Sequence, residues 1–365
     1  MGFKCGIVGL PNVGKSTLFN ALTQTAQAQA ANYPFCTIEP NIGEVAIPDI
    51  RRDNLAETAK SANKIPTRMT FVDIAGLVEG ASKGEGLGNK FLANIREMDA
   101  IAYVLRCFDN DDITHVGGKI DPLSDSQTVE TELMLADMES LERRLPALDK
   151  KSRGGDTESQ EILPVVEDLL TLLEKGKPAR YLKVKDDQIR TLRSLQLLTS
   201  KPVLYVCNVD EASASSGNDY SNAIDELAQS EEAVSIVISA EIESELSQLE
   251  ESDKQEYMDE LGVKESGLNS MIRSGYELLD LMTYFTAGPN ESRAWTVQNG
   301  STAPEAAGVI HTDFEHGFIR AEVIPYQEYV RLGGEQKCKE AGKMRVEGKE
   351  YIVRDGDVIY FRFNV

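Results

Sequence analysis

The sequence has no long hydrophobic run and contains few cysteines. No apolar run approaches the roughly 20 residues of a transmembrane helix, and the first residues, MGFKCGIVGL, predict a buried strand rather than a signal peptide. The 5 cysteines are odd in number and scattered, mostly within apolar segments. This pattern is typical of free thiols in a reducing cytosol and argues against a disulfide or zinc framework. We therefore expect a cytoplasmic protein without a membrane partner, and 365 residues allow two or three domains.

Positive charge is also scarce, with 38 basic against 60 acidic residues and a net charge of −22. A protein that coats nucleic acid non-specifically should be basic, so we expect no DNA partner. The deficit is uneven, because residues 281–365 carry 12 acidic and 10 basic side chains. We call six basic residues in this segment the basic cluster: Arg331, Lys337, Lys339, Lys343, Arg345 and Lys349. The cluster is consistent either with a solvated face or with a contact to a polyanion such as RNA.

The segment GIVGLPNVGKSTLFNAL contains a complete phosphate-binding loop. Gly9-x4-Gly14-Lys15-Ser16 follows a predicted strand at residues 4–8 and precedes a predicted amphipathic helix. Glycines let backbone N–H groups surround phosphates, and the helix N-terminus adds partial positive charge. We expect Lys15 to neutralise the β- and γ-phosphates during catalysis and the Ser16 hydroxyl to bind Mg²⁺. The predicted phosphate-binding residues of this loop are Asn12, Val13, Gly14, Lys15, Ser16 and Thr17.

Two further motifs follow in the order of a nucleotide-dependent switch. Thr37, in NYPFCTIEP, is placed to close on Mg²⁺ when the γ-phosphate is present. MTFVDIAGLV predicts a strand that ends in Asp73-x-x-Gly76, with Asp73 beside the Mg²⁺ and the Gly76 N–H at the γ-phosphate. The next residue is Leu77, where Ras-like enzymes have a glutamine that orients the attacking water. Hydrolysis must therefore be slow or use another residue.

His115 is the candidate for this second role. It follows IAYVLRCF, a predicted strand of the same sheet, and it is one of only 3 histidines. A histidine can orient or deprotonate a water molecule near neutral pH. A loop histidine with no catalytic role is an equally open alternative.

The segment VLYVCNVDEAS lies where related nucleotide-binding proteins recognise the base. Guanine offers two donors to the carboxylate of the usual NKxD element, but here Val209 replaces the lysine and the carboxylate belongs to the longer Glu211. Because a lost hydrogen bond at a buried polar group costs about 1–3 kcal/mol, we expect weakened guanine preference and admission of adenine. Asn208 should brace the loop, and Ser239-Ala240, after the strand AVSIVIS, should present backbone to the base.

Two other regions have recognisable patterns. Apolar residues step 4-3-4-3 from Met134 to Leu148 and 4-3-4 from Ile162 to Leu173, on either side of the turn KSRGGD. This spacing predicts an antiparallel coiled-coil hairpin. From about Leu281 the chain predicts a small α+β domain, with an amphipathic segment at residues 325–332 and a β-hairpin turn at Asp355-Gly356. Its predicted β-rich segments are RAWTVQNG, AAGVIH, GFIRAEVI and YIVRDGDVIYFRF.

Five segments together resemble the YchF subfamily of Obg-like ATPases: GLPNVGKST, NYPFCTIEPN, DIAGLVEGASKGEGLGN, NVDE and IVRDGDVIYFRFNV. The resemblance covers essentially the whole chain. It implies an α/β P-loop NTPase domain with a mostly parallel sheet (1–128 and 200–278), an inserted helical hairpin (129–199) and a C-terminal β-grasp (TGS) domain (279–365).

The resemblance also implies ATP in preference to GTP and association with ribosomes. In the family a hydrophobic residue replaces the catalytic glutamine, which Leu77 matches, and a histidine in a mobile loop is the proposed substitute, which His115 matches. Asn12 is similar to an asparagine that recruits potassium in related enzymes, so the implied cations are Mg²⁺ and K⁺.

The sequence therefore predicts a slow Mg²⁺-dependent ATPase that acts as a switch on the ribosome or its RNA. Two alternatives stay open: a GTPase of the same fold, and a nucleotide-gated binding protein in which hydrolysis is incidental. A metabolic kinase is disfavoured because no second substrate pocket is evident in the sequence.

Overall fold

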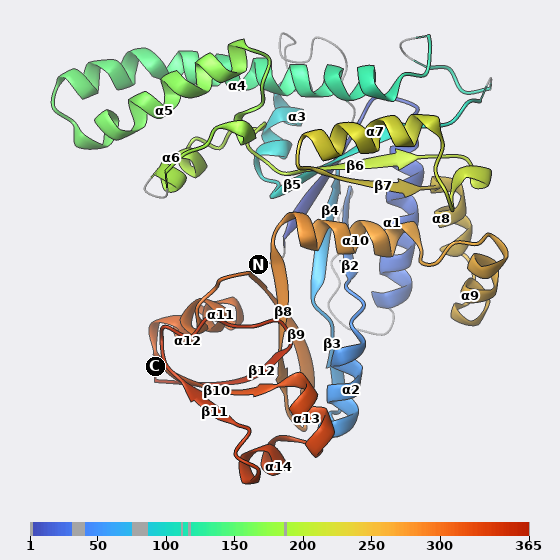
Figure 1. Cartoon of the computed structure of the whole chain (residues 1–365), viewed down its shortest axis with the longest axis vertical. Coiled ribbons are helices and arrows are strands. Elements are labelled where there is room, and N and C mark those ends of the chain that lie inside the picture. The colour runs from blue at the N-terminus through green and yellow to red at the C-terminus, as the bar shows by residue number, and fades with distance from the viewer. Residues whose placement is uncertain are drawn as a thin grey trace.

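The computed structural model of the protein describes residues 3–30, 41–74, 87–110, 112–115, 118–185 and 188–364. Within these residues the chain forms two six-stranded sheets and a projecting pair of helices (Figure 1). The predicted positions Thr37, Gly76 and Leu77, and also Cys36, lie outside the described residues.

The first sheet is parallel except at one edge. Its order is β2 (Ile42–Ala46), β4 (Arg68–Asp73), β1 (Lys4–Val8), β5 (Ala100–Arg106), β6 (Val203–Asn208) and β7 (Val234–Ile238). Only the β2–β4 pair is antiparallel. All residues of β5 and β6 are buried, as expected for central strands covered on both faces. The carboxyl ends of the parallel strands therefore meet along one edge, where ligands bind in open α/β sheets.

Helices cover both faces of this sheet (Figure 1). On one face lie α1 (Lys15–Ala30) and α10 (Gly267–Leu278), and on the other α7 (Asp219–Ser230) and the start of α4. The remaining helices of this part are α3 (Leu87–Arg96), α8 (Ala240–Leu246), which packs on α1, and α9 (Glu251–Glu260). Polar caps start several of them: Asn218 with a capping box at α7, Ser239 at α8 and Ser266 at α10.

The predicted helical hairpin is confirmed. α4 (Pro122–Arg153) and α5 (Thr157–Glu174) run antiparallel across a short turn and project from the sheet (Figure 1). The seam between them contains Leu141, Val166 and Leu169, all fully buried. α4 begins earlier than the heptad pattern, and its first turns place Val129 and Leu133 in the core of the first sheet. The chain returns through η2 (Ala179–Tyr181) and α6 (Ile189–Ser194).

The second sheet contains mainly C-terminal strands. Its order is β11 (Arg345–Glu347), β10 (Phe318–Pro325), β12 (Asp357–Phe363), β8 (Leu281–Ala287), β9 (Glu291–Gln298) and β3 (Asn63–Ile65). Its helices are α11 (Ala303–Ile310), α12 (Thr312–His316), α13 (Tyr326–Leu332) and α14 (Glu335–Glu340). The predicted amphipathic segment at 325–332 is thus confirmed as α13.

Residues 50–65 join the two sheets. β3 pairs in parallel with β9, and α2 (Ile50–Ala59) places Leu55 in the same core as Phe285 of β8. The guanidinium of Arg51 bonds Asp355 at 2.5 Å. The limits of the three predicted parts remain a prediction, and this pairing places residues 63–65 in the sheet of the C-terminal part.

Two local predictions in the C-terminal part are wrong. AAGVIH lies at the end of helix α11, because a capping box between Thr302 and Glu305 and a proline in the first turn favour a helix start. Asp355-Gly356 does form a turn, with Gly356 at φ +83°, but not a β-hairpin. The turn is bonded to Thr283 of β8, β12 pairs with β10 and β8, and Ile352 bridges Thr302. Long-range pairing has overridden the local turn signal.

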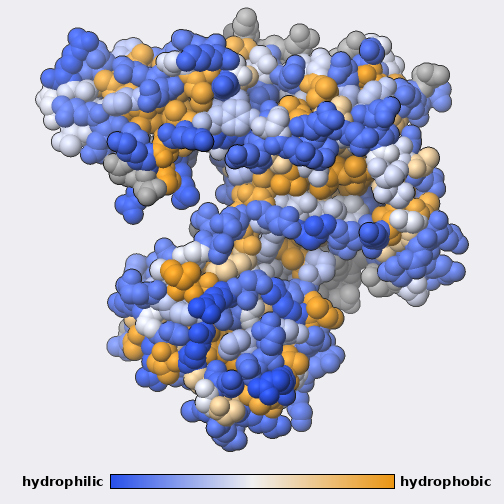
Figure 2. Space-filling view, viewed as in Figure 1, coloured by the Kyte–Doolittle hydropathy of each residue, from blue (hydrophilic) through white to orange (hydrophobic). Residues whose placement is uncertain are grey.

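The surface is mainly hydrophilic in the view of Figure 2. On this face hydrophobic residues gather between α7 and α10, where Figure 1 shows β6 and β7. In the described parts of the chain, no helix combines the length and the apolar character needed to cross a bilayer. The four described cysteines are buried free thiols, as predicted: Cys5, Cys107, Cys207 and Cys338.

Candidate nucleotide site

The phosphate loop is packed so closely against the sheet that two positions require glycine. A Cβ on Gly14, which has φ +95°, would lie 2.2 Å from the side-chain nitrogen of Asn208. A Cβ on Gly9 would lie 2.4 Å from the carbonyl oxygen of Val104. Between them Asn12 adopts φ +64°. The loop is thus held in a curled conformation of the kind that aims N–H groups at an anion.

Lys15 lies at the start of α1 and is only 8% exposed. Its ammonium group donates to the carbonyl oxygens of Gly9 at 2.7 Å and Leu10 at 2.6 Å. Burial lowers the pKa of Lys15 to about 8, although Asp73 acts in the opposite direction. Carbonyl dipoles are weaker counter-charges than a phosphate, so this cation is prepared for an anionic ligand.

Asp73 is the last residue of β4, and its carboxylate is close enough to the Lys15 ammonium group for the two charges to attract each other. Burial raises its pKa while Lys15 lowers it. Its Oδ1 is buried and has no hydrogen-bond partner among the described residues. An orphaned buried carboxylate oxygen requires an explanation, and a bound hydrated cation supplies one.

The first turn of α1 provides the hydroxyl groups of the site. Ser16 and Thr17 are exposed there, whereas Val13 in the preceding loop is buried. In the described residues no cluster of three or more His, Cys, Asp or Glu could hold a metal. Mg²⁺ typically needs only one or two protein oxygens beside waters and substrate phosphates, so the residues present fit it.

Asn208 braces the loops as predicted. Its Nδ2 donates to the carbonyl of Val13 at 2.9 Å, and its Oδ1 accepts from the backbone N–H of Ala240 at 2.9 Å. Asn208 is 4% exposed, so both bonds are shielded from water. One side chain thus joins the phosphate loop to the loop after β7.

The other predicted base-binding residues lie around this bridge. Val209 is buried, and its N–H donates to Ile238. Glu211 is exposed and begins η4 (Glu211–Ser213). The Ser239 hydroxyl caps α8 by accepting from Ile242 at 3.5 Å, while the N–H of Ala240 is taken by Asn208. Their contacts with a base remain predictions.

His115 lies close to the phosphate loop in the fold, but its side chain packs on α4. The side-chain nitrogen of Asn12 donates to the carbonyl of Thr114 at 3.1 Å. His115 Nε2 is 2.9 Å from Asp125 Oδ2, and the imidazole is 6% exposed. Burial raises the pKa of Asp125, and the bond with His115 lowers it. The structure therefore brings the loop to the site and buries the ring against a carboxylate.

Sequence reasoning missed three buried charged residues near these loops. Arg106, at the end of β5, is 1% exposed and bonds three carbonyl groups of the segment before His115. The available signal was a charged residue within the otherwise apolar segment IAYVLRCF. Asp125 and Glu243 had no comparable signal, because each is buried by contacts distant in sequence or across a loop.

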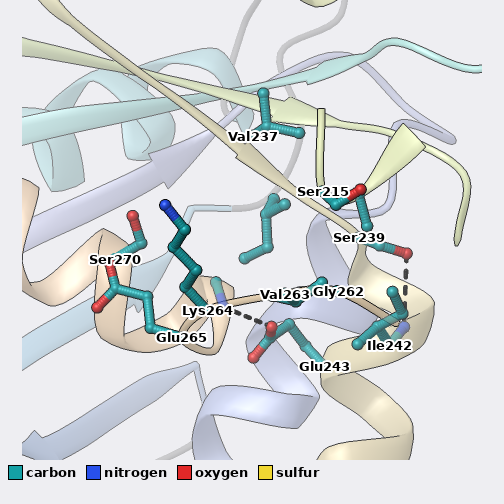
Figure 3. Close-up of a pocket in the computed structure, with 13 residues that line it drawn as sticks. Ser215, Val237, Ser239, Ile242, Glu243, Gly262, Val263, Lys264, Glu265 and Ser270 are labelled. Carbon is teal, nitrogen blue, oxygen red and sulfur yellow. Dashed lines mark hydrogen bonds between the residues drawn. The ribbon is translucent and has the colours of Figure 1, made fainter. Parts of the chain in front are cut away.

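Glu243 lines a cavity of about 300 Å³ behind the loop after β7 (Figure 3). Its carboxylate accepts from the N–H groups of Gly267 at 2.6 Å and Leu268 at 3.3 Å at the start of α10. Burial raises the pKa of Glu243 to about 7, against the effect of these bonds. Ser239 and Lys264 also line the cavity, but Lys15, Ser16 and Asp73 do not, so it is separate from the phosphate loop.

Two family models match the chain. The model MMR_HSR1, described as 50S ribosome-binding GTPase, matches residues 4–143. The model YchF-GTPase_C, described as a protein of unknown function, matches residues 281–364.

Curated relatives match over the full length of both chains. Proteins from Haemophilus influenzae, Escherichia coli O157:H7 and Bacillus subtilis are 58%, 54% and 53% identical and are each named ribosome-binding ATPase YchF. A solved structure titled as the Schizosaccharomyces pombe YchF GTPase is 40% identical, with a TM-score of 0.88, covering 99% of this chain and 98% of that one. On this evidence the chain belongs to the YchF family of P-loop nucleotide hydrolases.

Proposed function

We propose that the protein is a slow Mg²⁺-dependent ATPase whose nucleotide state controls its binding to the ribosome. The observation that carries this proposal is the state of two charges beside the phosphate loop: the buried Lys15, bonded only to loop carbonyls in the described residues, and the half-buried Asp73, whose Oδ1 has no described partner. A nucleotide phosphate and its cation would satisfy both. The names of the full-length relatives support hydrolysis of ATP and ribosome binding.

Mg²⁺ would be held by the Ser16 hydroxyl and by Thr37, with Asp73 bonding through its water shell. When bound, the cation neutralises charge on the β- and γ-phosphates. Lys15 adds a second positive charge at the same phosphates, and the loop N–H groups, with the Gly76 amide, fix their oxygens. A K⁺ ion at Asn12 is a further proposal, which rests on family resemblance.

ATP is proposed as the preferred nucleotide. Val209 is buried and apolar where a lysine stem would cover guanine, and the exposed Glu211 is longer than the aspartate that accepts both guanine donors. GTP binding is the second candidate, because the similar solved structure is titled a GTPase. Both share the phosphate chemistry and differ only at the base.

His115 is proposed to orient the attacking water, because Leu77 has no hydrogen-bonding group. A carboxylate within hydrogen-bond distance of Nε2 fixes the orientation of the imidazole ring. Asp125 is 2.9 Å from Nε2 and supports this role. Slow turnover follows because no arginine finger or glutamine is evident in the sequence.

The ribosome contact is proposed to involve the basic cluster and RNA. Its residues come from α13, α14, β11 and the segments beside them, which are neighbours in the C-terminal part (Figure 1). Arg331 and Lys343 are partly neutralised by Glu328, which lowers the net charge available to RNA. Work on the ribosome would place the protein in the cytoplasm.

Competition binding tests the choice of nucleotide. The protein is loaded with a fluorescent ATP analogue and titrated with ATP and with GTP, each with Mg²⁺. We expect ATP to displace the probe at lower concentration than GTP. Displacement by GTP at equal or lower concentration would favour the GTPase.

Co-sedimentation with ribosomes in ATP, in ADP and without nucleotide tests whether nucleotide state controls ribosome binding. Ribosome binding that does not depend on nucleotide would contradict this control.

A further inference from the structure

We infer that Arg106 is a positioning residue of the hydrolytic site, which acts by holding the segment that carries His115 against the phosphate loop. This inference rests on the proposed role of His115. The charge of Arg106 is not needed to form β5, so its function is to hold the following loop.

The side chain of Arg106 donates hydrogen bonds to backbone carbonyl groups of the loop. Its Nε donates to the carbonyl of Phe108 at 3.2 Å, Nη1 to that of Ile113 at 2.9 Å and Nη2 to that of Asn110 at 2.9 Å. The guanidinium also lies 4.9 Å from the centre of the Phe108 ring. The fork geometry of one side chain thus fixes three points along six residues of loop.

The energetic cost of this arrangement argues for a purpose. Arg106 is 1% exposed, and among the described residues no carboxylate forms an ion pair with it. Taking an unpaired charge out of water is expensive, and an aliphatic residue would satisfy the burial of the strand without that cost. Among the described residues, the three carbonyl bonds and the Phe108 ring compensate this cost, and all of them belong to the loop, so what the arginine contributes is the shape of the loop.

Other contacts extend the shape to the phosphate loop and to α4. The N–H of Cys107 donates to the carbonyl of Asn208 at 2.8 Å, which anchors the start of the segment at the base-side brace. At its end Asn12 donates to Thr114, and His115 pairs with Asp125. Arg106 therefore fixes the span between two anchors that both touch nucleotide-binding loops. Without it, the Thr114 carbonyl and the His115 backbone would lose their fixed distance from Asn12.

The test separates positioning from general stability. The variants are Arg106→Met, Arg106→Lys, His115→Ala and the double variant Arg106→Met/His115→Ala, in the full chain. Single-turnover ATP hydrolysis gives the rate constant, ATP titration gives Kd, and thermal unfolding reports folding. Tyr220→Phe is the matched control, because it removes only the peripheral contact of Tyr220 with Asp109 on the same loop.

We expect Arg106→Met to slow hydrolysis about 10- to 100-fold, since small misplacements of a catalytic group have effects of this size. Kd should stay within about twofold, because the phosphate loop is held separately by Asn208. Arg106→Lys should recover part of the rate, as an ammonium can bond some of the carbonyls. The double variant should be no slower than His115→Ala, and Tyr220→Phe should match the wild type.

Three results in the Arg106 variants would overturn the inference. They are an unchanged rate in Arg106→Met, rate losses that multiply in the double variant, or a rise in Kd that parallels the loss of rate. If Arg106→Met does not fold, Arg106→Lys decides by the same split of rate and Kd. If His115→Ala hydrolyses ATP at the wild-type rate, the proposed role of His115 fails and this inference with it. If His115→Ala is slow while Arg106 variants are normal, only this inference fails.

Discussion

Charged side chains form ion pairs where the helical hairpin leaves the first sheet, which we call the root of the hairpin, whereas the described charges at the phosphate loop form none. At the root, Arg180 lies between two carboxylates, 2.8 Å from Glu130 and 3.3 Å from Glu231. The hydroxyl groups of Tyr103 and Tyr205 donate to the same carboxylates at 2.9 and 2.8 Å. At the phosphate loop, Lys15 faces carbonyl groups, and an oxygen of Asp73 has no described partner.

Two aspartates, the buried Asp137 and the half-buried Asp73, differ in their hydrogen bonds. Asp137, on α4, is 1% exposed and accepts from the N–H of Leu198 at 2.8 Å and from the N–H and hydroxyl of Thr199 at 2.8 and 2.7 Å. Burial raises its pKa, and these bonds lower it. Asp73 has burial without such bonds. The bonds of Asp137 fix α4 on the returning chain, whereas the unbonded oxygen of Asp73 leaves free energy that a ligand can recover.

We therefore expect the root of the hairpin to contribute to the free energy of unfolding and the phosphate loop to contribute to ATP affinity. Replacement of Arg180 by methionine should have the largest effect. It leaves the part-buried Glu130 and Glu231 without their cation, so the loss of unfolding free energy should lie near the lower end of the about 3–5 kcal/mol found for fully buried pairs. Denaturant unfolding measures this loss, while the ATP Kd should stay within about twofold.

A matched variant sharpens that result. Arg180→Met combined with Glu130→Gln and Glu231→Gln removes the uncompensated charges and should recover part of the lost stability. A loss of ATP affinity in Arg180→Met equal to its loss of stability would contradict the division between the two regions.

Lys15→Met tests the other side of the comparison. We expect ATP affinity to fall about 100-fold, because a charge-assisted contact with the phosphates is lost. The free energy of unfolding without nucleotide should not fall, since the variant removes a buried cation that has only carbonyl partners among the described residues. A destabilisation like that of Arg180→Met would show that Lys15 is a structural charge.

Asp73→Asn should have a smaller, cation-dependent effect. With Mg²⁺ present, we expect ATP affinity to fall about tenfold, because a neutral amide no longer attracts the hydrated cation. In EDTA the variant and the wild type should bind ATP alike. Asp156→Asn, at the exposed start of α5, is the control and should change neither value. Equal loss with and without Mg²⁺ would remove Asp73 from the cation site.

The parts of the fold that could be predicted are those that depend on short-range patterns in the sequence. The strand at residues 4–8, the helix from Lys15 and the heptad seam of the hairpin follow from short-range spacing, and the structure has all three. The prediction of a strand in AAGVIH was wrong because a helix cap starts α11 there. The prediction of a hairpin at Asp355-Gly356 was wrong because β12 pairs with β8 and β10 instead.

Contacts between distant segments could not be predicted in this way. β3 joins β9 across more than 200 positions, and Arg180 finds Glu130 50 positions away. The functional importance of Arg106 depends on three carbonyl groups, which no side-chain pattern encodes. A motif predicts site residues where it fixes side-chain chemistry, as for Lys15 and Asp73, whose roles remain predictions, and it predicts none where the backbone is the partner.

The smallest predicted effect is a pH dependence that belongs to the phosphate loop alone. Because burial lowers the pKa of Lys15 to about 8, the free protein loses this charge near that pH, and ATP must then bind together with a proton. ATP affinity should weaken about eightfold between pH 7.5 and 9 in the wild type, as the protonated fraction of Lys15 falls, and stay flat in Lys15→Met. Stability changes in the opposite sense. The folded state releases the proton at about 8 and the unfolded chain near 10.5, so this group makes unfolding harder as pH rises between those values. Titrations of Kd and of unfolding free energy over this range should therefore diverge. If both weaken together above pH 8, the titrating group is not Lys15.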